Sequence, residues 1–80
     1  MQLAEFLASE KDYYSIQLGK IFAELKAFNY SIEKFQNVRR ESKLFLRARL
    51  GVVDSLVNAK EKGAAQNVLE ELIEDGYNDA

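Results

Sequence analysis

Residues 14–35 read YSIQLGKIFAELKAFNYSIEKF, and this stretch decides the fold class of the chain. Large apolar side chains recur in it at alternating spacings of four and three residues, the period of a helix in a left-handed coiled coil. We call these positions the heptad seam; they are Tyr14, Leu18, Ile21, Leu25, Phe28, Ile32 and Phe35. The unbroken spacing predicts one helix that presents the seam to the core or to a second chain.

The first helix is expected to begin well before the seam. Ser9 followed by Asp12 resembles a capping box, with Asp in place of the usual Glu or Gln. We therefore predict a helix over about residues 2–37, either continuous or hinged at residue 9. Gly19 lies inside it, but an interior glycine costs only about 1 kcal/mol, too little to end a helix of this length.

The seam ends after Phe35, because the next two positions in its register are the polar Arg39 and Ser42. This break predicts a turn between residues 36 and 42, followed by a second helix over about residues 39–62. The second helix is apolar over more than half of its circumference, so it needs covering on two sides.

The end of the second helix is predicted from the segment Lys60–Gly63. Its lysines suit the negative end of a helix, and a glycine there favours the left-handed capping conformation. A short third helix is expected over about residues 64–75. Gly76 would end it, leaving residues 76–80 as a frayed tail.

These elements together predict an all-α fold. The chain contains no proline, and its β-branched residues do not alternate, so no strand is expected. We predict a single helical domain over residues 1–80: an elongated antiparallel hairpin of two long helices with coiled-coil-like packing, plus a short C-terminal third helix. The third helix covers only part of the hairpin, and the remaining apolar surface predicts a homodimer.

The composition argues against an enzyme. Histidine and cysteine are both absent, which removes the commonest general base, thiol nucleophiles, disulfides and the usual zinc ligands. The four glycines are scattered, so they are interpreted as helix caps and positions of close helix approach rather than a phosphate-binding loop. Carboxylates gather between Glu70 and Asp79 without a second acidic motif, which indicates a solvated helix face. We expect no catalytic residue, no metal and no cofactor.

Basic residues concentrate around the predicted turn. Six of the eleven cations lie within residues 34–49. On a continuous helix Arg39, Lys43 and Arg47 would form one stripe, which could neutralise phosphates or steer an acidic protein partner. The structural alternative is pairing with the acids of the third helix. Tyrosines off the seam are typical of interaction patches. The predicted partner contacts are Arg39, Arg40, Lys43, Arg47, Tyr13 and Tyr30.

The functional hypothesis is a non-enzymatic interaction module: an adaptor, assembly chaperone or inhibitor that docks helices with a protein partner, as a homodimer. The alternative is a small nucleic-acid-binding accessory protein that uses the basic residues 39–49. No apolar run approaches the roughly 18 residues that span a bilayer, so no membrane role is expected. The first residues lack the basic start and apolar stretch of a signal peptide, which predicts a cytoplasmic protein.

Overall fold

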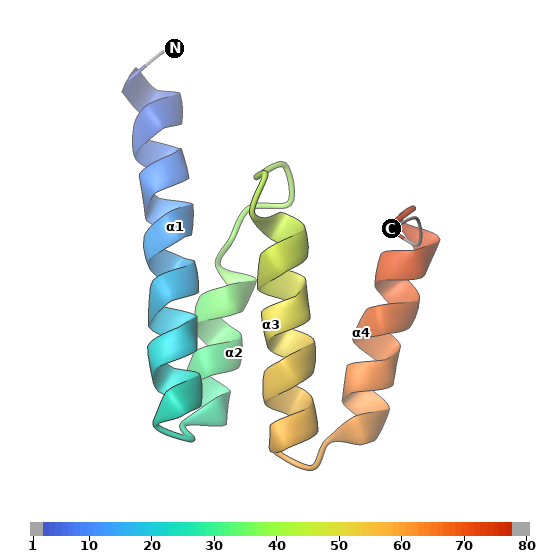
Figure 1. Ribbon diagram of the computed structural model, residues 1–80. Helices are drawn as coiled ribbons and strands as arrows, with labels where there is room; N and C mark the ends of the chain where they lie inside the picture. The colour runs from blue at the N-terminus through green and yellow to red at the C-terminus, as the bar shows by residue number, and fades with distance from the viewer. Residues whose placement is uncertain (1–2, 78–80) are drawn as a thin grey trace.

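The computed structural model describes residues 3–77, and this part of the chain is helical with no strand (Figure 1). Its helices are α1 (Leu3–Glu24), α2 (Phe28–Gln36), α3 (Phe45–Asn58) and α4 (Lys62–Glu74). The all-α prediction is therefore confirmed. The predicted layout of two long helices and a short third one is wrong, because the first long helix is two helices.

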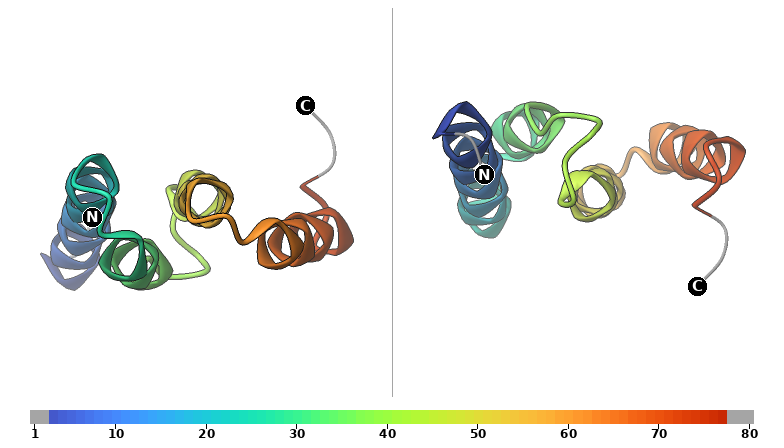
Figure 2. Two further views of the ribbon diagram at one scale, coloured as in Figure 1. Left: turned by 90° about the horizontal axis from the view of Figure 1, so that it is seen from below. Right: turned by 90° about the horizontal axis from the view of Figure 1, so that it is seen from above.

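The four described helices stand side by side in chain order and alternate in direction (Figures 1 and 2). Each helix packs on the next one, α1 makes a smaller contact with α3, and α4 contacts only α3 among them. The molecule measures 41 × 31 × 17 Å along its principal axes. Since one helix with its side chains is about 10–12 Å across, the row lacks a second covering layer, and every helix keeps an outer face.

The first helix ends at a turn that the sequence analysis did not place. Lys26 takes the left-handed conformation, with φ of 62°. Its N–H donates to Ala23 O at 3.0 Å, and the N–H of Ala27 donates to Phe22 O at 2.9 Å. This pair of hydrogen bonds is the Schellman motif, which normally has glycine at the left-handed position. The chain therefore reverses here, and α2 returns along α1. No hinge occurs at Ser9, since α1 is continuous through it.

The end of the second helix is built in the same way. Lys60 has φ of 68°, and Glu61 N–H donates to Leu56 O at 2.8 Å. The prediction that this helix runs to about residue 62 with Gly63 as its cap is wrong, because α3 ends at Asn58 and Gly63 already lies in the first turn of α4. Gly76 does end α4, with φ of 96°, as its sequence position predicts. Of the predicted tail, residues 78–80 lie outside the described part of the chain.

The predicted turn between residues 36 and 42 falls within a longer loop over residues 37–44. Successive hydrogen-bonded turns build this loop, and Ser42 Oγ accepts a hydrogen bond from Leu44 N–H at 3.0 Å. The second long helix consequently begins at Phe45 rather than at residue 39.

The core lies where α1, α2 and α3 meet. It is formed by Ile16, Phe35, Val38, Ala48 and Val52. The ring of Phe35 lies between two glycines: a Cβ atom would be 2.7 Å from the ring at Gly19 and 2.6 Å from it at Gly51. The interpretation of glycines as positions of close approach is confirmed at these two residues.

Candidate interaction surface

Two buried serines fix the arrangement of the first three helices. Ser31 Oγ on α2 donates to Gly19 O on α1 at 2.7 Å and lies 2.9 Å from Ser55 Oγ on α3. Both side chains are fully buried, and within the described residues every buried side-chain polar atom has a hydrogen-bond partner. Satisfied buried polar contacts favour a single arrangement of the helices, so their outer faces are held in fixed positions.

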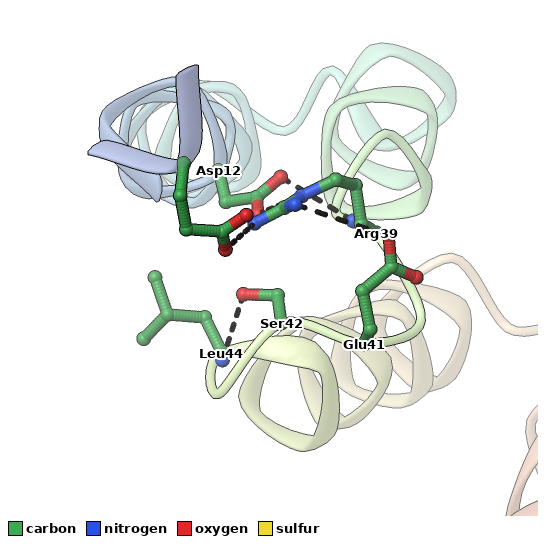
Figure 3. Close-up of polar contacts among 6 residues, drawn as sticks. Asp12, Arg39, Glu41, Ser42 and Leu44 are labelled. Carbon is green, nitrogen blue, oxygen red and sulfur yellow. Dashed lines mark hydrogen bonds and ion pairs between the residues drawn. The ribbon is translucent and has the colours of Figure 1, made fainter. Parts of the chain in front are cut away.

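An ion pair ties α1 to the loop before α3. Asp12 is 2% exposed, and its carboxylate accepts from Arg39 Nε at 2.8 Å and from Arg39 backbone N–H at 3.3 Å. Figure 3 shows the two side chains pointing toward each other, with Glu41 beside the guanidinium. The guanidinium also lies 3.5 Å from Glu5 and 3.8 Å from Glu41. Asp12 thus binds Arg39 instead of capping a helix.

The carboxylates around Arg39 raise the pKa of its guanidinium. The side-chain hydrogen bond to Asp12 raises the pKa of Arg39 above its ordinary value, and the nearby charges of Glu5 and Glu41 add to this, while burial opposes it. A raised pKa keeps the Arg39 guanidinium charged, so deprotonation of this arginine removes the ion pair only at strongly alkaline pH. Arg39, a predicted partner contact, is therefore engaged within the chain.

Two more arginines of the basic cluster pair with acids at the C-terminal end of α4. Arg40 lies 2.8 Å from Asp75, and Arg49 lies 3.2 Å from Glu71. Each guanidinium is also 5.9 Å from the ring centroid of Phe45. Glu71 and Asp75 thus pair with the basic cluster, as in the structural alternative; Asp79 lies outside the described residues.

The predicted basic stripe does not form. Arg39 and Lys43 belong to the loop, so they do not share a helix face with Arg47 on α3. Lys43 and Arg47 are both exposed and form no ion pair with another residue of the 3–77 range. Two cations of the cluster are therefore free for an outside partner, from separate elements.

The two predicted tyrosines are exposed and lie on different helices. Tyr13 on α1 accepts a hydrogen bond at its hydroxyl from Gln17 Nε2 at 2.9 Å. Tyr30 on α2 packs its ring against Phe22, with the centroids 5.5 Å apart. Neither tyrosine is held in the core, so both hydroxyl-bearing faces are accessible.

The heptad seam is divided by the turn at residues 25–27. Its last member, Phe35, is 5% exposed, and Phe28 and Ile32 are partly buried. Its first four members are 42–70% exposed. The prediction of one helical face is wrong, because the reversal at Lys26 turns the second half inward and leaves the first half facing outward.

The exposed half belongs to a longer apolar stripe that runs along α1 and ends at Leu25, in the turn that follows the helix. We call it the outer stripe; it consists of Leu3, Leu7, Tyr14, Leu18, Ile21 and Leu25, which are 42–72% exposed. The opposite side of α1 holds its buried residues Asp12, Ser15, Ile16 and Gly19. α1 stands at the end of the row, so no described helix covers the outer stripe (Figure 2).

A groove lies between α1 and α3. This groove has a volume of about 380 Å³ and a floor that includes Phe35 and Gly51. Its rim carries Lys20 and Glu24 from α1, and Arg47 and Asp54 from α3. The groove lies near the lower end of the volume range of ligand pockets, and the mixed charge of its rim does not define a substrate class.

The described part of the chain contains neither a metal-binding cluster nor a membrane-spanning helix. Across residues 3–77, no group of three or more metal-ligating side chains is placed to hold an ion. No helix in the described range is long and apolar enough to cross a membrane. Comparisons with protein-family models, curated proteins and solved structures give no match.

Proposed function

We propose that this chain is a non-enzymatic protein-interaction module, an adaptor, assembly chaperone or inhibitor, that docks α1 against a helix of a protein partner. The observation that carries the proposal is the outer stripe of α1. Monomeric soluble proteins rarely expose large contiguous apolar surfaces, and those that do use them for binding. An apolar row along one helix suits a partner that is itself helical.

The energetics support docking of this kind. Burying a large apolar side chain contributes about 1.5–3 kcal/mol, and the six stripe residues are each roughly half to two-thirds exposed. Covering them would contribute on the order of 5–10 kcal/mol, and the partner surface would contribute a similar amount. Association costs about 4–15 kcal/mol, so a helix with a matching apolar face supplies a free energy comparable to this cost or larger than it.

The way in which α1 is held also supports the proposal. The Ser31 and Asp12 contacts anchor its inner side to α2 and to the loop before α3. A face that is already ordered before binding loses less conformational entropy when a partner arrives. The outer stripe is therefore a preformed docking surface.

The nucleic-acid alternative receives less support. Arg39, Arg40 and Arg49 pair with the chain's own carboxylates, which lowers the positive charge available to phosphates. The free cations Lys43 and Arg47 lie on separate elements. An uncovered apolar face is also not what a phosphate backbone binds.

Affinity purification tests the proposal. A tagged chain is recovered from the cells that produce it, beside a Leu18→Glu/Ile21→Glu variant and a Leu69→Glu/Ile73→Glu control. The control pair lies on α4 with 41% and 55% exposure, against 42% and 50% for the stripe pair. We expect a protein that is retained by the wild type and the control and lost by the stripe variant, and that binds the purified chain directly. The proposal would be overturned if every co-purifying protein were recovered equally well with the stripe variant and with the control.

A further inference from the structure

The outer stripe has the same spacing in both directions from Tyr14. The row occupies positions 3, 7, 10, 14, 18, 21 and 25, with successive spacings of 4, 3, 4, 4, 3 and 4. Every position is apolar or aromatic except the third, which is Glu10. A row with this property can lie against an inverted copy of itself with all positions aligned.

We propose that a second copy of this chain occupies the outer stripe, with its α1 antiparallel and the two-fold axis passing beside Tyr14. The inference rests on the proposed function, since it names the occupant of the same docking surface. In a two-fold dimer one surface meets itself, so that residue i contacts j and j contacts i. In this register Leu3 meets Leu25, Leu7 meets Ile21, and Tyr14 meets its own counterpart.

The charged residues beside the stripe agree with this register. In this register Glu10 of one copy lies level with Leu18 of the other copy. Gln17 of that other copy lies on the same flank, and its side-chain amide can donate a hydrogen bond to the Glu10 carboxylate. The two Glu10 side chains stand eight residues apart in level, about 12 Å at 1.5 Å per residue. A parallel pairing would instead place Glu10 of the row against Glu10 of the other copy. Like charges therefore favour the antiparallel copy.

The length of α1 gives the contact sufficient area. Its 22 residues extend about 33 Å, and the antiparallel register matches the row from end to end. Two helices in contact over that length, each about 10 Å wide, bury on the order of 1,000 Å² of accessible surface, near the lower limit for a specific interface. We therefore expect a dimer that forms in the micromolar range.

The absence of cysteine from the chain makes the register directly testable. A disulfide needs Cβ atoms about 3.5–4.5 Å apart, so a single cysteine cross-links two copies where it meets itself. Under mild oxidation of the full chain, Tyr14→Cys should form a disulfide dimer at least about ten times faster than Tyr30→Cys, which is comparably exposed on α2. Leu3→Cys should link to Leu25→Cys in a mixture but not to itself. Rapid self-linking of Leu3→Cys would show a parallel pair and overturn the register.

Sedimentation of the cysteine-free chain tests the occupant itself. We expect a dimer at about 100 μM that Leu18→Glu weakens about tenfold or more, because two carboxylates would meet. Leu18→Lys should retain the dimer, since Glu10 of the other copy lies opposite. A monomer at 100 μM would overturn the proposal that a second copy occupies the stripe, but it would not contradict the proposal that a foreign protein binds there. A dimer whose stripe captures no other protein would instead contradict the proposed function alone.

Discussion

The ring of Phe35 is held between two glycines, and this contact sets how closely the first three helices approach. Gly19 faces it from α1 and Gly51 from α3, so a side chain at either position would push the ring toward the other helix. The ring cannot swing away from one glycine without meeting the other. At the residue scale, the packing of the core therefore depends on glycine at positions 19 and 51 as much as on the five apolar side chains of the core.

Replacing Gly51 with alanine should destabilise the protein despite the higher helix propensity of alanine. The new Cβ would lie 2.6 Å from the Phe35 ring, and such overpacking costs about 1–3 kcal/mol, while the propensity gain returns at most about 1 kcal/mol. The control is Gly63→Ala, because no atom lies within 4 Å of that position. It should stabilise the protein by about 0.4–1 kcal/mol. Urea unfolding at one fixed protein concentration measures both, and equal signs would contradict the steric account.

At the scale of elements, the two lysine-centred turns decide the helix boundaries. Lys26 and Lys60 hold the left-handed conformation that ends α1 and α3, a position normally given to glycine. For a residue with a Cβ atom, this conformation is less favourable than the right-handed one by about 1–2 kcal/mol. The Schellman hydrogen bonds and the packing of the helices that follow compensate for that cost.

Lys60→Gly should therefore stabilise the protein. Glycine adopts the left-handed conformation without the Cβ clash, and we expect a gain of about 0.5–1 kcal/mol, or a rise in Tm of several degrees for a domain of this size. Lys62→Gly is the matched control, because residue 62 begins α4 in a helical conformation. That substitution should lower Tm. Thermal unfolding followed by circular dichroism gives both values, and a fall in Tm for Lys60→Gly would show that the lysine side chain itself is needed at the turn.

The same turns explain which parts of the structure the sequence could predict. Helix content follows from the four-and-three spacing, and that spacing continues through Leu25 and Phe28 although the chain reverses between them. No glycine, proline or asparagine marks the reversal, because Lys26 takes the left-handed position. Gly76 follows the ordinary rule and was placed correctly.

The candidate surface was predictable in part for a related reason. Local spacing identifies the apolar residues of α1, but only the path of the chain decides whether they face inward or outward. The pairing of Asp12 with Arg39 joins residues 27 positions apart, and neither residue has a local signal for it. The basic stripe failed because it required a helix through the loop over residues 37–44.

At the scale of the whole molecule, a single row of helices gives the 80-residue chain little interior. The row is 17 Å thick along its shortest axis, and only seven apolar residues in the described range are buried. Small domains usually add a disulfide, a metal or a second copy to such a core. The second copy that we propose against α1 would be such an addition, and it would leave the groove between α1 and α3 open on another side.

The charge distribution leads to the last prediction, that the protein does not bind nucleic acid appreciably. Its formal net charge is −2, and three arginines of the basic cluster are paired with carboxylates of the chain. A protein that neutralises many phosphates binds far more tightly at 50 mM than at 200 mM salt. Fluorescence anisotropy with a random duplex and a random single strand should show no binding at about 10 μM protein in 50 mM salt. Binding that weakens steeply with salt, and that Lys43→Ala/Arg47→Ala abolishes while Lys60→Ala/Lys62→Ala does not, would instead favour the nucleic-acid function.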